Sequence, residues 1–284
     1  MNHSALKALS TYPSVGGIVY ALKNDSIPDK KIALAQKKSG ELSALNIALG
    51  SSARRHRYTA LVLYFLHENF HWIPPLIWTL HWCKLIGPAS AWFEYLLQGN
   101  SRQSLRTAKN LLNQFFSTSR KDLFILDIGS GIGQLPQQFP VQKGVNWICA
   151  DKNFFSLFLA QLYFSRPDIH YVCADLELQR LFDPNTFSAA VCIDCFDFIF
   201  QKDVFLEQTA KSLKSPGQFL MINLHEEQPG TETWGYGIDH QDLIKVLKKH
   251  FQTVTWHDMT DPLHTRRAHF ADLDSLRYSF VAHK

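Results

Sequence analysis

The sequence predicts an α/β fold in which a doubly wound parallel sheet follows a helical segment, and three observations lead to this prediction. From residue 123 onward, short apolar runs alternate with helical stretches, which is typical of parallel strands joined by crossover helices. The first apolar run ends in an acid followed by three glycines at alternate positions, a turn expected at the carboxyl edge of such a sheet. Before residue 116, apolar residues instead recur at helical spacing. We therefore expect a helical domain over 1–115 and an α/β domain over 116–284.

The individual elements follow from the apolar periodicity and from the residues that interrupt it. Strands are expected at 123–128, 146–150, 170–174, 188–193, 218–224, 253–257 and 277–283. Helices are expected at 30–48, 58–71, 76–85, 90–97 and 103–116, then at 134–139, 153–165, 203–213 and 239–250. Four of the seven tryptophans lie in the first half: Trp72, Trp78, Trp82 and Trp92. We interpret them as core between helices, with an aromatic wall for an apolar substrate or an interfacial face as alternatives.

Composition and charge describe a globular chain with a large core. Of the 284 residues, 46% are hydrophobic and 19% are charged, and the net charge of +4 permits an anionic partner without requiring one. The N-terminus has no apolar signal segment, and no run of ~18 apolar residues occurs, so we predict no transmembrane segment and a cytoplasmic protein. The five cysteines are interpreted as reduced core residues, with Cys192-x-x-Cys195 as a redox or metal pair being the alternative.

The turn after the first predicted strand is expected to bind a nucleotide-like group. Asp127 ends the strand, and Gly129, Gly131 and Gly133 follow at alternate positions. Glycine adopts positive φ at little cost and lets the backbone approach a ligand closely. The spacing differs from the G-x-G-x-x-G pattern of dinucleotide sites, and no Lys-Ser/Thr follows as it would in a phosphate-binding P-loop. We expect this turn to precede a helix N-terminus at the carboxyl edge of the sheet.

The run Asp127-Ile128-Gly129-Ser130-Gly131-Ile132-Gly133 resembles the first motif of the class I S-adenosylmethionine-dependent methyltransferases. The resemblance covers about residues 116–284 and implies a Rossmann-like, doubly wound, seven-stranded methyltransferase sheet that ends in an antiparallel hairpin. It also implies S-adenosylmethionine as the cofactor. The first half of the chain, the N-terminal helical domain, matches no family that we can name.

The strand ends carry acids where the family resemblance expects them. Asp151 stands 22 positions after Gly129, and an acid ~20 residues beyond such a turn can accept hydrogen bonds from ribose hydroxyls. By resemblance, Lys152 lies near the adenine, Asp175 meets the adenine amino group, and the backbone amide of Leu176 meets the ring. Ile193 and Asp194 would lie near the methionine part, and Asp127 near its amino group. The predicted cofactor-binding residues are Asp127, Gly129, Ser130, Gly131, Gly133, Asp151, Lys152, Asp175, Leu176, Ile193 and Asp194.

The candidate catalytic residue is His225, directly after the fifth predicted strand of this domain. Methyl transfer is an in-line displacement in which the enzyme positions the acceptor and sometimes removes its proton, and a histidine titrates near neutral pH. The following loop, with Trp234 and Tyr236, could fold over a substrate, and His240 is a weaker candidate base. The fourth strand lacks the signatures of base-amino and cytosine-C5 methyltransferases. Asp197-Phe198 stands where quinone-type enzymes often have Glu-His, so no catalytic histidine is carried over there.

Two further patterns point to other chemistry. The run from His67 to His71 matches H-E-x-x-H, a zinc-binding pattern, and Glu94 could serve as a distant third ligand. Pro74-Pro75 ends that helix at once, the extended pattern is absent, and we predict no metal. The basic run Arg54-Arg55-His56-Arg57, with lysines at 30, 31, 37 and 38, is interpreted as a solvated helical face, with RNA binding as the alternative.

The sequence thus predicts an S-adenosylmethionine-dependent methyltransferase that acts on a small-molecule acceptor, with the N-terminal helices helping to build the acceptor site. One alternative is an RNA methyltransferase, for which salt-sensitive RNA binding would be diagnostic. The other is a cofactor-binding interaction module without turnover, and a metalloprotease is a distant third. The sequence specifies neither the acceptor, nor the atom methylated, nor the oligomeric state.

Overall fold

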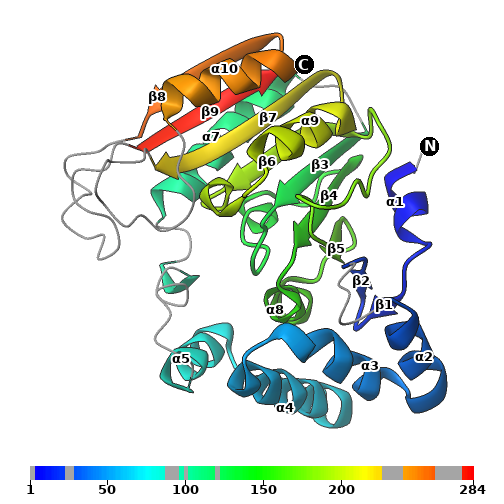
Figure 1. Cartoon of the computed structure of the whole chain (residues 1–284). Coiled ribbons are helices and arrows are strands. Elements are labelled where there is room, and N and C mark those ends of the chain that lie inside the picture. Colours follow the sequence, from blue (N-terminus) through cyan, green and yellow to red (C-terminus); the bar gives the residue numbers. More distant parts are fainter. Residues whose placement is uncertain are drawn as a thin grey trace.

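The computed structural model of this chain describes residues 4–22, 29–86, 96–98, 102–118, 122–225, 239–259 and 277–284. These residues form a nine-stranded sheet in the order β1-β2-β5-β4-β3-β6-β7-β9-β8 (Figure 1). The strands are β1 (Ser14–Val15), β2 (Ile18–Tyr20), β3 (Leu123–Ile128), β4 (Val145–Asp151), β5 (Ile169–Cys173), β6 (Phe187–Ile193), β7 (Leu213–His225), β8 (Thr253–Asp258) and β9 (Arg277–His283).

The sheet is doubly wound around β3. From β3 the chain adds β4 and β5 on one side and then β6 and β7 on the other, and all four pairings are parallel. The strand order therefore reverses between β3 and β6, and ligands of open α/β sheets bind at such a switch point beyond the carboxyl ends of the strands. β9 pairs antiparallel with both β7 and β8, which confirms the predicted closing hairpin.

All seven predicted strands are present. Except in the edge strand β8, whose residues are mostly exposed, most of their residues are buried on both faces of the sheet. In β3, Leu123 and Ile125 pack into one hydrophobic cluster, whereas Phe124, Leu126 and Ile128 pack into the other. A strand with both faces covered appears in sequence as a continuous apolar run. The helices α7 (Gln103–Thr118) and α8 (Phe154–Phe164) cover one face, and α9 (Lys202–Ser212) and α10 (His240–His250) cover the other.

The N-terminal half contributes two strands that the sequence did not predict. β1 and β2 form a hairpin whose turn, Gly16-Gly17, has positive φ at both positions, and β2 pairs parallel with β5. Positive φ at both turn residues matches the right-handed twist of the flanking strands. The hairpin was missed because its strands span only two and three residues, too few for periodicity to register.

The remaining helices of the first half are α1 (Ser4–Leu9), α2 (Asp29–Ser39), α3 (Glu41–Ala48), α4 (Arg54–Phe70) and α5 (Leu76–Ile86). The single helix expected over 30–48 is divided at Gly40, whose φ of 79° ends α2. Helices α2 to α5 pack into the same hydrophobic cluster as β3 and α8, so the two halves share one core. The boundary near residue 115 stays a prediction, and most of the helix expected over 90–97 lies outside the described residues.

Two expectations about the first half of the chain and the glycine turn were wrong. Trp72, Trp78 and Trp82 are not core residues, since 53%, 65% and 55% of their surfaces are exposed. α5 instead buries Thr79, Leu80 and Cys83; Trp92 lies outside the described residues. The helix expected over 134–139 is a turn followed by a 3₁₀ helix, Pro136–Gln138, because a proline inside an α-helix removes a hydrogen bond and clashes with the preceding turn.

The described cysteines are free, and four of the five are buried, in agreement with the interpretation as reduced core residues. No helix among the described residues is long and apolar enough to cross a membrane.

Candidate active site

A cavity of about 710 Å³ lies at the carboxyl ends of β3, β4 and β6, where the strand order reverses. Its volume falls within the range of about 300–1,000 Å³ that is usual for small-molecule sites. Ten of the eleven predicted cofactor residues line it: Asp127, Gly129, Ser130, Gly131, Asp151, Lys152, Asp175, Leu176, Ile193 and Asp194. The fold thus brings together residues that stand up to 67 positions apart in the chain.

The three glycines of the turn all have positive φ, but their surroundings differ. A Cβ on Gly129 would lie 2.5 Å from Cys195 Sγ, whereas a Cβ on Gly131 would meet nothing within 4 Å and would enter the cavity. Gly133 is not among the residues that line the cavity, and a Cβ there would lie 3.0 Å from the Tyr171 ring. The turn therefore packs tightly at both ends and opens to the cavity at Gly131.

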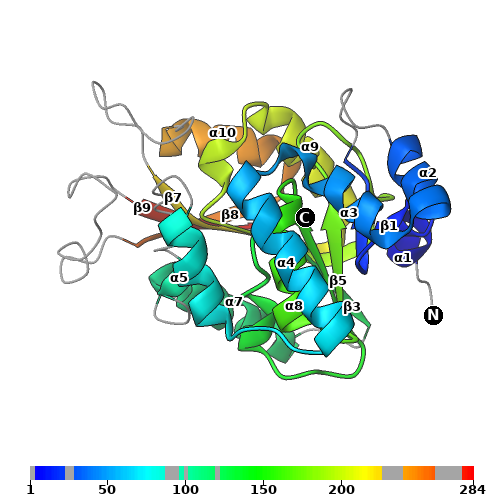
Figure 2. The ribbon, with the colours of Figure 1, turned by 90° about the horizontal axis from the view of Figure 1, so that it is seen from below.

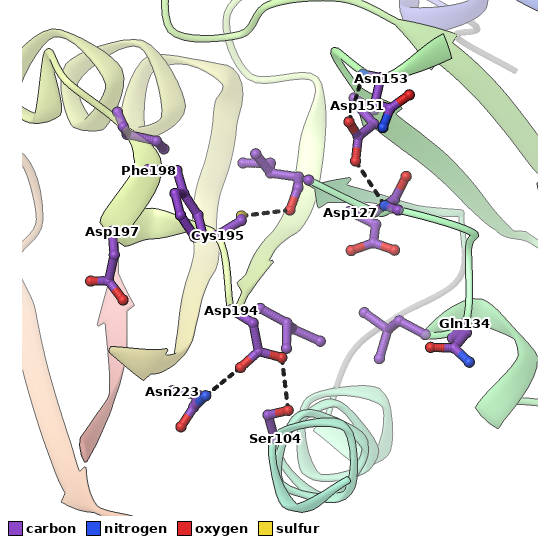
Figure 3. Close-up of a pocket in the computed structure, with 18 of the residues that line it drawn as sticks. Ser104, Asp127, Gln134, Asp151, Asn153, Asp194, Cys195, Asp197, Phe198 and Asn223 are labelled. Atoms are coloured by element: carbon purple, nitrogen blue, oxygen red, sulfur yellow. Dashed lines mark hydrogen bonds between the residues drawn. The ribbon is translucent and has the colours of Figure 1, made fainter. Parts of the chain in front are cut away.

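Asp151 holds this turn against β4. Its Oδ2 accepts a hydrogen bond of 2.8 Å from the Gly131 N–H, and its Oδ1 accepts one of 2.8 Å from the Asn153 N–H (Figure 3). Burial raises the pKa of Asp151, and these two backbone hydrogen bonds with the charge of Lys152 partly oppose the rise. Each carboxylate oxygen can accept a second hydrogen bond, so Asp151 can bind a ligand without releasing the turn.

Asp127 is a buried acid at the end of β3, with 3% of its surface exposed. Burial raises its pKa to about 8, the charge of Asp151 adds to the rise, and Arg102 opposes it. A carboxylate here is costly in the free protein, and a cation placed in the cavity would stabilise it.

Asp194 follows β6 and is held by residues from β7 and from the start of α7. It has a left-handed backbone with φ of 55°. Its Oδ1 accepts a hydrogen bond from Asn223 Nδ2 of β7, and its Oδ2 accepts one of 2.9 Å from Ser104 Oγ of α7 (Figure 3). Arg102 Nη1 lies 3.9 Å from Oδ2. Burial raises the pKa of Asp194 to about 7, with the Asn223 hydrogen bond opposing the rise.

The wall beyond Asp175 is formed by polar contacts of the backbone and by apolar side chains. Asp175 Oδ1 accepts a hydrogen bond of 3.1 Å from the Glu177 N–H, and Glu177 Oε1 accepts one of 2.6 Å from the Gln201 N–H. The apolar lining residues here are Ala150, Ala174, Leu176, Ile193, Phe198, Ile199 and Phe205. This part of the cavity is suited to a flat, largely apolar ring with a polar rim.

Sequence reasoning missed several polar residues of the lining, among them Arg102, Ser104, Gln134 and Asn223. Arg102 Nη2 donates a hydrogen bond of 2.7 Å to Gln134 Oε1, so the start of α7 is joined to the glycine turn. One signal was available for Arg102 and Ser104. A helix that leads directly into a buried strand runs antiparallel to it, so the start of α7 must lie near the carboxyl end of β3.

The candidate base His225 is the last residue of β7, where its backbone pairs with Arg277 of β9. Arg277 lines the cavity, so the strand end that carries His225 lies beside it. The loop with Trp234 and Tyr236 lies outside the described residues, and His240 begins α10. The catalytic assignment stays a prediction.

The competing motifs do not form metal sites among the described residues, where no group of three or more His, Cys, Asp or Glu side chains could hold a metal ion. His67 Nδ1 lies 3.1 Å from Glu68 Oε1 on the surface, and His71 ends α4 with a left-handed backbone. Glu94 lies outside the described residues. The Cys192 and Cys195 sulfurs lie 3.0 Å apart, and Cys195 Sγ donates to the Ile128 carbonyl oxygen.

Comparison with known families gives one match. Residues 126–221 match the family model described as "Methyltransferase domain". This stretch begins near the end of β3 and ends within β7, so it contains the glycine turn, Asp151, Asp175 and Asp194. A search of curated proteins found no match to this chain.

Solved structures share the fold at low sequence identity. Phosphoethanolamine N-methyltransferase 2 of Haemonchus contortus, in complex with S-adenosyl-L-methionine, has a TM-score of 0.55 and 16% identity, over 98% of this chain and 86% of that one. Another structure of that enzyme, with phosphomonomethylethanolamine and S-adenosylhomocysteine, has a TM-score of 0.51 and 18% identity, over 77% of this chain but 58% of that one. The [4+2]-cyclase SpnF has a TM-score of 0.51 and 13% identity, over 63% and 80%. At these identities the likeness shows the fold, and the cyclase indicates that the fold alone does not fix the reaction.

Proposed function

We propose that this chain, which contains a methyltransferase domain over residues 126–221, uses S-adenosylmethionine as its cofactor and methylates a small-molecule acceptor held in the cavity. The observation that carries the proposal is the lining of that cavity. Acids from the ends of β3, β4 and β6 surround it, and residues from the first half of the chain complete its wall. When bound, the cofactor supplies an electrophilic methyl group on a sulfonium centre.

Two features of the cavity lining support a position of the nucleoside half of the cofactor beside β4 and β5. Gly131 faces open space, so a ligand can approach the backbone there, and Ser130 Oγ is buried without a hydrogen-bond partner. In the proposed arrangement, Asp151 accepts hydrogen bonds from the ribose hydroxyls through its remaining lone pairs. Asp175 and the Leu176 backbone amide bind the adenine edge, and Lys152 lies beside them.

The amino acid end of the cofactor is proposed to lie between Asp127, Asp194 and Arg102. This end carries both an ammonium and a carboxylate at neutral pH. Asp127 and Asp194 attract the ammonium, and the Arg102 guanidinium, whose charge is always present, attracts the carboxylate. The two carboxyls, with pKa values raised to about 8 and about 7, become more fully ionised beside a bound cation.

The acceptor is proposed to bind on the β6–β7 side of the cavity, next to Phe198, Asn223 and Arg277. Asn223 Oδ1 is buried without a hydrogen-bond partner and can accept one from an acceptor amine or hydroxyl. His225, at the end of β7, is the proposed base that removes the acceptor's proton as the methyl group is transferred. Replacing His225 with Gln should lower kcat more than tenfold and leave cofactor affinity unchanged. An equal kcat would remove His225 from the mechanism.

The experiment that tests the proposed function separates binding from turnover. Calorimetry measures S-adenosylmethionine affinity, and mass spectrometry measures S-adenosylhomocysteine formed with a panel of amine, hydroxyl and carbon acceptors. Product formation with a small acceptor supports the proposal. Tight cofactor binding without product across the panel would favour a module without turnover, and product formed only with RNA would favour an RNA methyltransferase.

A further inference from the structure

Helices α4 and α5 lie on the underside of the molecule (Figure 2). Large apolar side chains of these two helices and of the turn between them are exposed. We call this group the α4–α5 surface. Its members are more than 45% exposed although each is a large hydrophobic side chain: Tyr58, Val62, Phe65, Phe70, Trp72, Ile77, Trp78, Trp82 and Leu85. Single exposed apolar residues are normal, but a contiguous group of this kind marks an interaction site.

The helical spacing explains why these side chains face outward together. Tyr58, Val62 and Phe65 stand at i, i+4 and i+7 on α4, and Trp78, Trp82 and Leu85 do so on α5. The opposite face of α5 is fixed to the body of the protein. Tyr163 on α8 donates a hydrogen bond of 2.9 Å to the Pro74 carbonyl oxygen, and its hydroxyl lies 2.7 Å from Thr79 Oγ1. The tryptophans are therefore presented on an anchored helix.

Basic side chains border one end of the α4–α5 surface. Arg55 Nη1 donates to the Ile86 carbonyl oxygen, which brings the start of α4 to the end of α5. Arg54, Arg55 and Arg57 lie in the first turn of α4, and Lys84 lies in the last turn of α5. Over residues 29–86 the chain has eight Lys and Arg against three Asp and Glu, an excess larger than the net charge of +4 of the whole chain.

A small cleft joins the basic end to the apolar stripe. It is lined by Asn46, Arg54, Arg57, Tyr58 and Leu61 and has a volume of about 410 Å³. The Arg54 guanidinium carbon lies 5.8 Å from the centre of the Tyr58 ring, and Arg57 Nε is buried without a hydrogen-bond partner. Cationic and amide donors beside an apolar side chain are suited to an anionic headgroup with an acyl chain next to it.

From this combination we propose that the α4–α5 surface binds the interface of an anionic lipid bilayer. Tryptophans prefer the headgroup level, leucine and isoleucine enter the acyl boundary, and Lys and Arg attract anionic lipids. A second copy fits less well, because it would cover the apolar side chains but supply no anionic partner for the basic end. RNA also fits less well, because bases could stack on the aromatic side chains but would leave the aliphatic Val62, Ile77 and Leu85 without an apolar partner.

The test is flotation of the full chain with lipid vesicles, and it needs neither methyl donor nor acceptor. We expect binding to phosphatidylcholine vesicles that contain about one third phosphatidylglycerol, weak binding to phosphatidylcholine alone, and a blue shift of tryptophan emission. Binding should fall when salt is raised from about 0.1 M to about 0.5 M, because the Debye length shortens. Failure of the proposed methyl transfer would leave this result unchanged, so the two proposals are tested separately.

Two valines give a matched control. Val62 is 55% exposed within the α4–α5 surface, and Val141 is 59% exposed outside it. Val62→Glu should weaken vesicle binding by roughly fivefold or more, and Val141→Glu should not. Trp78→Ala should reduce both binding and the emission shift. The proposal would be overturned if the protein does not bind vesicles, or if both valine variants lose binding equally. It would also be overturned if the protein binds RNA but no vesicles, or if it binds no vesicles and instead forms a dimer that Val62→Glu abolishes.

Discussion

Ser104 Oγ in the first turn of α7 donates a hydrogen bond of 2.9 Å to Asp194 Oδ2 at the end of β6. The two residues stand 90 positions apart, and Ser104 precedes the stretch that matches the methyltransferase family model. The contact therefore shows that the first half of the chain holds an acid of the candidate active site in position. Asn223 of β7 holds the other oxygen of the same carboxylate.

Replacing Ser104 with Ala should weaken cofactor binding, because Asp194 loses a donor that favours its charged form. Hydrogen bonds to charged groups contribute about 1.5–3 kcal/mol, so we expect a loss of at least roughly tenfold in affinity. The pKa of Asp194, already raised to about 7 by burial, should rise further. Calorimetry at several pH values measures both effects. Ser117→Ala is the control on the same helix, since Ser117 is exposed and bonds only the nearby Gln114 carbonyl; equal losses in both variants would contradict the assignment.

Replacing Asp151 with Ala tests the proposed ribose contact. The variant loses two acceptors for ribose hydroxyls and also the hydrogen bonds that hold Gly131 and Asn153. We expect cofactor affinity to fall about a hundredfold, on the basis of about 1.5 kcal/mol for each charged hydrogen bond lost, while the circular dichroism spectrum is retained. Asp183→Ala, at an exposed acid, is the control. Unchanged cofactor affinity in Asp151→Ala would show that Asp151 does not hold the ribose.

Alanine substitutions at Gly129 and Gly131 compare a position where a Cβ would clash with one where a Cβ would meet open space. Gly129→Ala would bring a Cβ within 2.5 Å of Cys195 Sγ, so we expect a loss of stability of about 2–4 kcal/mol in urea unfolding. Gly131→Ala meets no atom within 4 Å; it costs only about 1–2 kcal/mol of backbone strain, but its methyl group should block the cofactor.

Gly40 is the matched control for Gly131, because it also has positive φ and open surroundings but lies between α2 and α3. Gly40→Ala should lose similar stability and keep cofactor affinity. If Gly131→Ala binds the cofactor as well as Gly40→Ala does, the backbone at Gly131 does not approach the ligand.

Much of the second half could be predicted from sequence because both faces of its inner strands are buried, so each of these strands appears as an apolar run. The acids at the carboxyl ends of β3, β4 and β5 could be assigned to one edge because parallel strands share their direction. The prediction of a helix after Gly133 was wrong for a local reason, because Pro136 interrupts it. The prediction that the tryptophans are buried failed for a different reason, since apolar content alone does not reveal which face of α5 packs on the body of the protein.

The site residues that the sequence did not predict reach the cavity through contacts between distant segments of the chain. Nothing in the local sequence of Arg102 or Asn223 distinguishes it from an ordinary polar residue. Arg102 lies at the cavity because α7 runs antiparallel to β3, which places the residue just before α7 beside the glycine turn, where it donates a hydrogen bond to Gln134. Asn223 acquires its place at the irregularity between Ile222 and Leu224 in the pairing of β7 with β9, where its own φ is 63°. Such irregularities leave no periodic signal.

Burial raises the pKa of Asp127 to about 8, so we expect pH to affect protein stability and cofactor affinity in opposite directions. Between about pH 4, the ordinary value for aspartate, and pH 8, the folded protein retains a proton that the unfolded chain releases. The free energy of unfolding of the free protein should therefore fall as pH rises through this window. Cofactor binding should strengthen over the same window, because the proposed ammonium contact needs Asp127 ionised.

Asp127→Asn separates these effects, because asparagine has nearly the same shape and carries no titratable proton. Relative to the unaltered protein, the variant should gain thermal stability at pH 8 and gain little at pH 5. Its cofactor affinity should be weaker at pH 8 and should depend less on pH. Asp151 and Asp194, whose pKa values are also raised, keep some dependence in both proteins, so the difference between the two profiles is the quantity to compare. Differential scanning calorimetry measures the stability difference, and titration calorimetry measures the affinity difference. Both are done at about pH 5, 6.5 and 8, between the ordinary pKa of about 4 and the raised pKa of about 8. Parallel profiles for the two proteins would mean that Asp127 neither holds a proton in the free protein nor meets a cation in the complex.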